Sequence, residues 1–391
     1  MRYEKVIIGG GMVGAALACA LESSSSEIAL IDAGLNNFED QRLIALNHSS
    51  YTLFKNLAIW PALKPFATAI QEVHVSNRGH FGITRMRAEE LGVDVLGYVV
   101  PAKEINRALY QKLAAAKNIN LLRPAQLTAL KQESSHVTLT LKSDSTIQTL
   151  EANYAIAADG TQSTVRELLA IPTEIIDYQQ KAIVTITELQ RSHRNIAYER
   201  FLSNGAIAML PLADQTVATI WSSNEKNSDA LLQLSDDEFL EQLQQQFGYR
   251  LGHLIKIRER FVYPLKFVKA KEQINQRVVL IGNAAHTVHP IAAQGLNLAL
   301  YEIAILAEFF SQQTTEHFSL ANLAEQFQQQ NASLNLSHRL TQLFSADFFG
   351  IKIARQMGMF GLDICQVLKQ RFGKRVLGKI GRLPSLLVDE I

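Results

Sequence analysis

Hydrophobic runs near the N-terminus occur in the order expected of a parallel sheet. Val6 to Ile8 predict a short buried strand, and residues 12–21 predict a helix whose small residues allow close packing. A second apolar run, residues 28–31, ends at Asp32. The order strand, helix, strand therefore predicts the start of a βαβ unit.

The middle of the chain changes to alternation of apolar and polar residues. The alternation covers residues 181–223 and contains the hairpin signal Asn204-Gly205. It predicts an antiparallel sheet inserted into an otherwise parallel domain. A polar helix is expected over residues 235–247, and the apolar run that begins at Val278 returns the chain to the parallel pattern.

Weaker patterns predict four further elements. A helix is expected near residues 104–117, and alternation over residues 136–141 predicts a strand of a small antiparallel element. Residues 154–158 predict a buried strand closed by Asp159-Gly160, and one more strand is expected near residues 261–265.

A long helix is predicted after Gln294, and its apolar residues share one face. We expect that face to pack on a sheet and Glu302 and Glu308 to lie elsewhere. The predicted face consists of Leu296, Leu300, Ile303, Ala307 and Phe310.

The last fifty residues are expected to be helical and basic. From Lys352 to Arg382 there are eight Lys or Arg residues and one acid, Asp363. Two interpretations remain open: a solvated helix packed on the rest of the protein, or a peripheral contact with anionic lipid or a partner.

Composition indicates a folded protein and excludes several classes. The 391 residues are 47% hydrophobic and carry a formal net charge of +1, so we do not expect a nucleic-acid partner. Cys19 and Cys365 offer no disulfide framework or zinc spacing, which fits a reducing cytoplasm. The uncharged run between Lys5 and Glu22 is too short to span a membrane, so any membrane contact would be peripheral.

The first turn has the spacing of a dinucleotide-binding loop. Gly9, Gly11 and Gly14 form G-x-G-x-x-G between a strand and a helix, and Asp32 follows at the distance expected of a ribose ligand. The glycines allow backbone N–H groups and the helix N-terminus to approach a pyrophosphate. This pattern alone leaves NAD and FAD open.

A second turn from strand to helix, VVLIGNAAHTVHPIAAQGLN, favours FAD. It occupies residues 278–297, and the helix that begins near Gln294-Gly295 would direct its amides at the far end of a long nucleotide. Reduction of a flavin builds negative charge at its pyrimidine edge, which a helix N-terminus stabilises. A nicotinamide offers no such anion.

The spacing of His286 and His289 superficially matches a metal motif. No carboxylate or Cys partner lies near them in sequence, so we predict no metal site. We expect both to line the flavin or substrate cavity, or to cap the turn.

Several motifs together resemble the single-component FAD-dependent aromatic hydroxylases. The glycine loop, Asp32, Arg42 in EDQRLIAL, ADGTQSTVR and GNAAHTVHPIAAQGLN occur in that family's order over about the first 340 residues. Within the family, HVSNRGHFG and YERFLSNGAIAMLP are similar to the ubiquinone-biosynthesis ring hydroxylases, closest to those acting on 2-polyprenyl-6-methoxyphenol.

The resemblance implies an α/β fold of three parts. These are a Rossmann-like FAD-binding domain, an inserted antiparallel-sheet substrate domain and a C-terminal helical tail. The expected segments are 1–72, 101–177 and 269–340 for the FAD-binding domain, 73–100 and 178–268 for the substrate domain, and 341–391 for the basic C-terminal helices.

The resemblance also implies how the cofactor is held. The glycine loop and Asp32 would hold the ADP half, Arg42 would approach the phosphate or ribityl side, and Asp159-Gly160 would close over FAD and the nicotinamide donor. The implied cofactor-binding residues are Gly9, Gly11, Met12, Val13, Gly14, Asp32, Arg42, Asp159, Gly160, Gly282, Asn283, Pro290, Ala293, Gln294, Gly295, Leu296 and Asn297.

Four positions depart from the family pattern. Asn283 stands where most of the family has an Asp that bonds a ribityl hydroxyl, and its amide oxygen can still accept that bond, so we expect weakened FAD binding. Gln41 and Ala293 replace glycines, and Glu302 replaces an Asp.

The implied reaction is hydroxylation of a polyprenylated phenol by O2. NADPH or NADH would reduce FAD, and a flavin C4a-hydroperoxide would transfer oxygen to the ring carbon para to the hydroxyl. His289 and Tyr198 are candidates to polarise the phenol. Expected walls of the substrate pocket are Leu210, Pro211, Trp221 and Pro290.

Two alternatives stay open: a sister hydroxylase acting on another ring position or phenol, and a scaffold subunit that has lost efficient flavin use. The expected location is the cytoplasm or the inner face of its membrane, where the basic tail would contact lipid or a ubiquinone-biosynthesis complex. The sequence leaves open a homo-oligomer.

Overall fold

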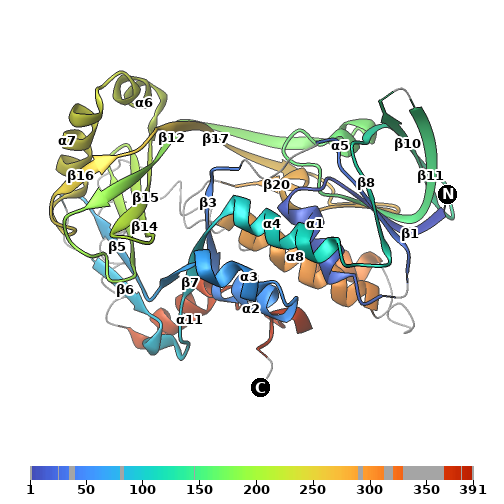
Figure 1. The fold of residues 1–391 in the computed structure, drawn as a ribbon, viewed down its shortest axis with the longest axis horizontal. Helices are drawn as coiled ribbons and strands as arrows, with labels where there is room; N and C mark the ends of the chain where they lie inside the picture. Colours follow the sequence, from blue (N-terminus) through green and yellow to red (C-terminus); the bar gives the residue numbers. More distant parts are fainter. Residues whose placement is uncertain are drawn as a thin grey trace.

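The computed structural model has two lobes joined by two long strands (Figure 1). It describes residues 2–24, 26–34, 40–79, 83–144, 146–288, 294–311, 320–328, 365–379 and 381–389. One lobe is built on a largely parallel sheet and the other on an antiparallel sheet.

The parallel lobe contains eight strands. Pairing is parallel from β19 through β11, β1 and β2 to β8, so the carboxyl ends of these strands lie at one edge. The path is β18 (Ile274–Asn275), β19 (Val278–Leu280), β11 (Thr146–Ala157), β1 (Arg2–Ile8), β2 (Ile28–Ile31) and β8 (Ile119–Leu122), with β10 (Val137–Ser143) and β9 (Gln126–Gln132) added antiparallel to β11.

Helices cover one face of this sheet. α1 (Met12–Ala20) lies between α4 (Ala102–Leu113) and α8 (Gln294–Ser311), as Figure 1 shows. Their apolar residues form one core with Ile7, Leu30 and Ile156 of the strands. β9 and β10, together with α5 (Thr164–Leu168), enclose a second core on the opposite face. Both faces are therefore buried, which explains the continuous apolar runs of β1 and β2.

The second lobe is a nine-stranded sheet. The alternating segment predicted over residues 181–223 forms its centre, and the hairpin at Asn204-Gly205 is confirmed. The path is β20 (His286–Thr287), β17 (Phe261–Ala270), β12 (Thr173–Leu189), β15 (Thr216–Asn224), β14 (Gly205–Pro211), β13 (Ile196–Leu202), β5 (Glu72–Asn77) and β6 (Ile83–Arg87), with β16 (Leu254–Ile257) paired to β12.

The two faces of this sheet meet different neighbours. α6 (Glu225–Leu232) and α7 (Asp236–Phe247) cover what we call the outer face, where Ile183, Met209 and Trp221 pack on Phe239. The inner face meets a three-stranded sheet, β3 (Leu43–Asn47), β7 (Gly97–Pro101) and β4 (Thr68–Ile70), which leads into the parallel lobe. Because side chains alternate along each strand, every second residue belongs to each face.

Short helices complete the connections. α2 (His48–Asn56) begins with the Asn47 side chain accepting a hydrogen bond from the Ser50 N–H at 2.9 Å. The remaining short elements are α3 (Trp60–Leu63), η1 (Lys64–Phe66), η2 (Glu89–Leu91) and η3 (Gly282–Ala284).

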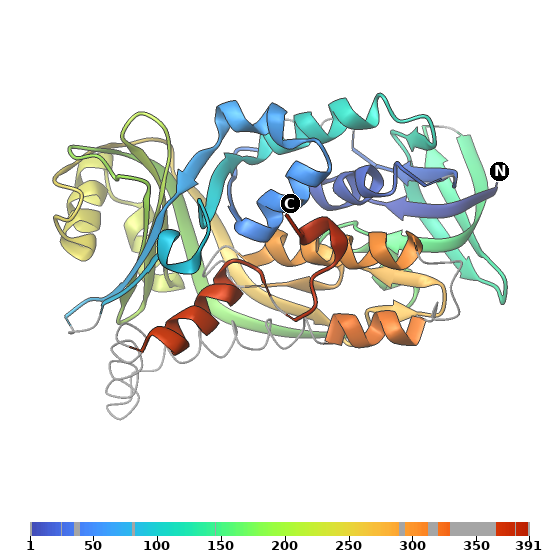
Figure 2. The same cartoon turned by 90° about the horizontal axis from the view of Figure 1, so that it is seen from below.

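The described part of the basic tail packs on the protein. α11 (Gln366–Val376) lies beside η2, with Lys369 Nζ 2.8 Å from a carboxylate oxygen of Glu90. η5 (Ser385–Leu387) then crosses α2 and α8, and the Asn56 amide donates to the backbone oxygens of Leu386 and Val388 (Figure 2). Residues 341–364 of the expected tail lie outside the described residues.

Among the described helices, none combines the length and apolarity needed to cross a membrane.

Most elements predicted from the sequence are confirmed, with shifted ends. The first strand begins earlier, at Arg2, and the helix expected over residues 104–117 occupies 102–113. The predicted polar helix is α7, capped by Ser235 and Glu238 in a capping box. The three-stranded sheet was not predicted.

Truncating Phe239 tests how the outer face holds its helices. Phe239 is fully buried and its ring centroid lies 5.4 Å from that of Trp221. We expect Phe239→Ala to lower the free energy of unfolding by about 4 kcal/mol through the cavity it leaves. Urea denaturation followed by tryptophan fluorescence measures this. Phe66→Ala, at a half-exposed position, should be near neutral, and equal effects of the two variants would contradict the packing described.

Candidate active site

Three turns meet at the carboxyl edge of the parallel sheet. They follow β1 at Gly9, β11 at Ala158-Asp159 and β19 at Gly282, and these strands are sheet neighbours. A Cβ added to Gly9 would lie 2.4 Å from the Ala158 oxygen, and one added to Gly282 would lie 3.2 Å from the methyls of Val13. The two turns singled out in the sequence, far apart along the chain, therefore form one site.

The first turn leaves backbone N–H groups open for an anion. Gly9 has φ of +105°, and a Cβ on Gly14 would lie 1.9 Å from the Gly9 oxygen, so both positions require glycine. A Cβ on Gly11 would meet nothing within 4 Å. Gly11 is the N-cap of α1, and no side chain caps that helix. The space at Gly11 and the uncapped helix start could accommodate the pyrophosphate that the sequence leads us to expect here.

Asp32 lies at the end of β2, where the sequence placed it. The hydroxyl of Tyr110 donates to the Gly10 oxygen at 2.7 Å and lies 3.3 Å from an Asp32 carboxylate oxygen. Arg123 Nε lies 3.4 Å from the same carboxylate. The Nη2 atom of Arg123 is buried and has no partner among the described residues, so this corner retains an unused donor beside the predicted ribose ligand.

Of the two carboxylate oxygens of Asp159, one accepts a hydrogen bond within the described structure and the other does not. Its Oδ2 accepts a hydrogen bond from the Val165 N–H at 3.1 Å, which ties the turn to α5. Its Oδ1 is buried and lacks a partner among the described residues. A buried carboxylate oxygen without a donor is costly, so this atom indicates a group that the site is built to bind. Gly160, with φ of +83° and open space around it, continues the turn.

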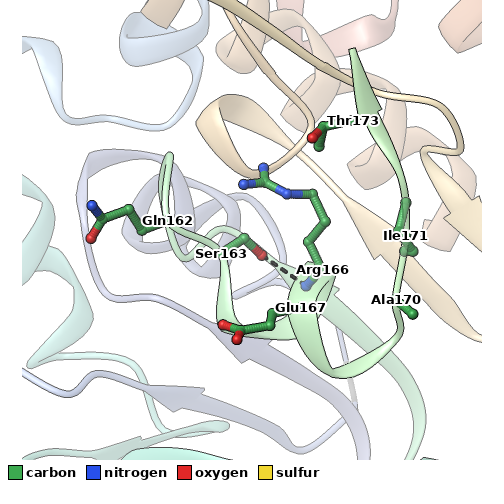
Figure 3. A pocket seen from close by; sticks show the side chains of 7 residues that line it. All are labelled: Gln162, Ser163, Arg166, Glu167, Ala170, Ile171 and Thr173. Carbon is green, nitrogen blue, oxygen red and sulfur yellow. Dashed lines mark hydrogen bonds between the residues drawn. The ribbon is translucent and has the colours of Figure 1, made fainter. Parts of the chain in front are cut away.

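Arg166 joins the second and third turns. Its guanidinium donates to the Thr161 oxygen at 2.6 Å and to the Ala284 oxygen at 2.9 Å, and its backbone N–H donates to Ser163 Oγ at 3.1 Å (Figure 3). The motif ADGTQSTVR thus fixes the Asp159 turn against the Gly282 turn through a cation and two carbonyl groups.

The hollow drawn in Figure 3 lies beside α5 and is open and polar. Its polar lining comes mainly from Gln162, Ser163, Arg166 and Glu167. A prenylated ring needs apolar walls, so this hollow does not suit the predicted substrate.

A buried carboxylate supports the third turn. Glu302 Oε2 accepts the Gly282 N–H at 2.8 Å, and Oε1 lies 2.8 Å from His286 Nε2 and 2.5 Å from Gln273 Nε2. The side chains of Glu302 and His286 are 1% and 2% exposed. The expectation that Glu302 lies away from the buried face of α8 was therefore wrong, because the turn after β19 covers that side of the helix.

His286 lies beneath the third turn, which fits the second of its two predicted roles, capping the turn. Its ring contacts Glu302 beneath the turn, and its Nδ1 is buried without a partner among the described residues. The imidazole thus supports the turn from within. His289, Pro290 and Ala293, also predicted to be site residues, lie outside the described residues.

The first turn of α8 holds β3 in place. Asn297 Oδ1 accepts the Asn47 N–H at 2.9 Å, and Asn297 Nδ2 donates to the Ala45 oxygen at 2.9 Å. The neighbouring predicted residues Gln294, Gly295 and Leu296 are partly exposed at this helix start. Asn283 is exposed on η3, and no interaction of its side chain with another described residue is seen.

Arg42 lies between the lobes, just before β3. Its guanidinium makes a bidentate contact with Asp40, with a shortest distance of 2.6 Å. Burial raises the pKa of Asp40, but the hydrogen bonds from Arg42 outweigh this effect and hold that pKa below its usual range. The Tyr263 side chain of β17 lies near enough to interact electrostatically with Arg42. Arg42 thus stands where the inner face approaches the three turns.

The register of the antiparallel sheet separates the predicted substrate residues. Leu210 lies on the inner face and packs with the three-stranded sheet. Trp221 lies on the outer face, where it packs on Phe239, and Pro211 shares that face by register with Val217. Tyr198 is also on the outer face, 5.8 Å from the Phe247 ring. These placements do not support a substrate contact for Trp221, Pro211 or Tyr198.

Sequence reasoning missed the residues that hold the turns together. Tyr110, Arg123 and Gln273 belong to the site only through contacts that cross the fold. One feature of the sequence did indicate the buried network around Glu302. Glu302 stands where the family has an Asp, so the acid is kept within an apolar helix, and a buried acid needs a polar partner.

The chain is similar to known proteins over nearly its whole length. A family model described as an FAD binding domain matches residues 2–325. The ubiquinone hydroxylase UbiL of Rhodospirillum rubrum is 31% identical, covering 98% of this chain and 92% of that protein. The 3-demethoxyubiquinol 3-hydroxylase of Escherichia coli is 26% identical, covering 96% and 98%. The structure of p-nitrophenol 4-monooxygenase PnpA from Pseudomonas putida matches the fold with a TM-score of 0.79 at 15% identity, covering 98% and 100%.

Removing the Glu302 carboxylate tests the support of the third turn. Glu302→Ala leaves the Gly282 N–H, His286 and Gln273 without their shared acceptor, so we expect a loss of about 3 kcal/mol of stability and weaker cofactor binding. Chemical denaturation and cofactor titration measure the two effects. The exposed Glu325→Gln is the matched control, and wild-type behaviour of Glu302→Ala would show that the network does not hold the turn.

Proposed function

This chain belongs to the FAD binding domain family, and from that premise we propose that it is an FAD-dependent monooxygenase that hydroxylates the ring of a polyprenylated phenol in ubiquinone biosynthesis. The family model covers most of the chain, and the relatives named as ubiquinone-pathway hydroxylases align over nearly all of it.

The observation that carries the proposal is the convergence of three turns on one sheet edge. The Gly11 space, the uncapped start of α1 and the unpartnered Asp159 Oδ1 all lie along this edge. Together they fit a long dinucleotide whose pyrophosphate lies at the first turn and whose flavin end lies toward α8. A single phosphate or a nicotinamide dinucleotide would leave the third turn without a role.

The chain's own residues bind and orient the reactants. The amides of the first turn and of α1 would hold the pyrophosphate, Asp32 the ribose, and the exposed amide of Asn283 the ribityl chain. When bound, reduced FAD would supply the activation of O2, one atom of which enters the ring. The start of α8 would place positive potential at the flavin's pyrimidine edge.

The inner face supplies the apolar surroundings that the substrate needs. Most of its residues on the central strands are small or apolar, among them Ala182, Val184, Ala197, Ala206, Ala208, Leu210, Ala218 and Ile220. Small side chains leave room beside the sheet, and apolar ones exclude water from an activated oxygen. This surface suits an aromatic ring with a prenyl tail better than a charged metabolite.

The electron donor and the tail complete the proposal. We expect NADPH or NADH to reach the flavin from outside, because the chain contains one dinucleotide fingerprint.

The basic tail offers a peripheral contact with a membrane that holds prenylated substrates. Val367 and Leu368 on α11 are 60% and 48% exposed, close to the basic residues of that helix.

Turnover with isotope-labelled O2 tests the proposed function. The purified protein should be yellow, should oxidise NAD(P)H faster when a short-chain 2-prenyl-6-methoxyphenol is added, and should place one labelled oxygen atom on the ring. Labelling of another phenol instead would indicate a sister hydroxylase. A protein that takes up no FAD would support the scaffold alternative and contradict the enzyme.

Restoring an acid at position 283 tests the ribityl contact. The neutral amide of Asn283 should bind a ribityl hydroxyl less strongly than a carboxylate would, so Asn283→Asp should tighten FAD binding about tenfold. Quenching of flavin fluorescence on titration measures the dissociation constant. Asn204→Asp, at the exposed hairpin turn, adds the same charge elsewhere and should change nothing. Equal affinities for wild type and Asn283→Asp would place the ribityl chain away from η3.

A further inference from the structure

A single acid lies on the inner face of β13. Glu199 pairs by register with Val75 of β5 and Ala208 of β14, and its neighbours along the strand on the same face are Ala197 and Phe201. The register row that crosses the sheet through Glu199 contains no other charged residue. It consists of Thr84, Val75, Glu199, Ala208, Ile220, Val184 and Phe261.

The inner face lies toward the carboxyl edge of the parallel sheet, where the three turns meet. Ala197, two residues before Glu199, packs in one cluster with Leu43 and Ala45, which directly follow Arg42. Tyr263, on the same face of the sheet, interacts with Arg42 itself. Glu199 therefore belongs to the wall that separates the three turns from the outer-face helices.

Glu199 has no compensating partner among the described residues. Its side chain is partly buried, and no hydrogen bond or ion pair to it is seen in that part of the chain. Arg200, the next residue along β13, and Arg85 of β6 are on the outer face of the sheet, opposite to Glu199. There they lie with Arg250 around His74. Burial alone raises the pKa of Glu199 to about 7.

We propose that Glu199 is the catalytic residue that accepts the proton of the substrate's phenolic hydroxyl. The inference rests on the proposed function and adds the acid-base group that the sequence did not identify. An isolated carboxyl on an apolar wall is rarely kept without a role, because its burial costs stability. A phenol hydroxyl would supply the one hydrogen bond that Glu199 lacks in the described structure.

The proton transfer balances without an additional reactant. The O–H bond of the phenol breaks and an O–H bond forms on the Glu199 carboxylate, which leaves electron density on the ring for attack on the oxygen donor. When the ring carbon that received oxygen loses its own proton to the oxygen atom left on the donor, aromaticity returns and Glu199 gives its proton back to the phenol oxygen. The carboxylate is then ready for the next turnover.

The pH dependence follows from the raised pKa. Below pH 7 the carboxyl is protonated and cannot accept the proton, so the hydroxylation rate should rise as the pH passes through about 7. By register, Tyr263, Glu188 and Lys256 share this face, and the Arg42–Asp40 pair lies beside it. Hydrogen bonds between Arg42 and Asp40 raise the pKa of Arg42 and lower that of Asp40, so this pair stays charged across that range.

As the pH rises, the stability of the folded protein should fall while the hydroxylation rate rises. Because the folded-state pKa of Glu199 is raised, ionisation is harder in the folded protein than in the unfolded chain, and stability is lost as the pH rises through about 7. Glu199→Gln removes this loss, so its melting temperature should exceed that of wild type at pH 8.5 and match it more closely at pH 6.

Three variants of the FAD-loaded protein test the proposal. Glu199→Gln should lower kcat for hydroxylation by about a hundredfold and flatten its pH profile, while flavin content and the rate of flavin reduction stay at wild-type values. Glu199→Asp should recover part of kcat, and Glu241→Gln, on the exposed side of α7, should behave as wild type. A Glu199→Gln enzyme with wild-type kcat and pH profile would overturn the proposal.

A binding measurement separates this proposal from the proposed function. The affinity of the oxidised holoprotein for 2-methoxyphenol, followed by flavin fluorescence, should rise through pH 7 in wild type and stay flat in Glu199→Gln. 1,2-Dimethoxybenzene, which has no hydroxyl, should bind both proteins independently of pH. If wild type hydroxylates no phenol, the proposed function fails. If the two proteins bind 2-methoxyphenol with the same pH dependence, the role of Glu199 fails.

Discussion

The site depends on the parallel pairing of β1, β11 and β19. Their carboxyl ends lie side by side, so the turns that follow them are brought together without any side-chain contact. The closeness of the turns then determines the residues: Gly9 and Gly14 have no room for a Cβ, and Gly282 has little beside Val13. Sheet pairing thus explains why the chain uses two glycine turns separated by most of its length.

Polar contacts fix the turns in their positions. Arg166 joins the second turn to the third, Glu302 holds the third turn from below, and Asn297 connects the start of α8 to β3. Each of these side chains bonds a backbone group in another segment. A cofactor held at this edge would meet amides that are already ordered, which reduces the entropy lost on binding.

The helices and strands could be predicted from the sequence, but the face of the antiparallel sheet on which each side chain lies could not. Alternation identified β12 to β15 because a strand with two distinct faces has a period of two, and the glycine spacing identified the first turn. Alternation cannot say which face meets the cofactor when both faces are covered. Trp221 and Tyr198 were for this reason expected in the pocket, although they pack under α7, whereas Glu199 on the inner face was missed. The Glu302 network was hidden because its partners His286 and Gln273 are 16 and 29 residues away.

The central claim is that one FAD molecule lies along the edge formed by the three turns, with its flavin facing the inner face of the antiparallel sheet. A crystal structure of the protein with FAD tests it most directly. We predict the pyrophosphate at the Gly11 amide, a cofactor contact to Asp159 Oδ1, and the flavin between η3 and the face that carries Glu199. A flavin bound on the outer face, or a pyrophosphate away from α1, would contradict the account.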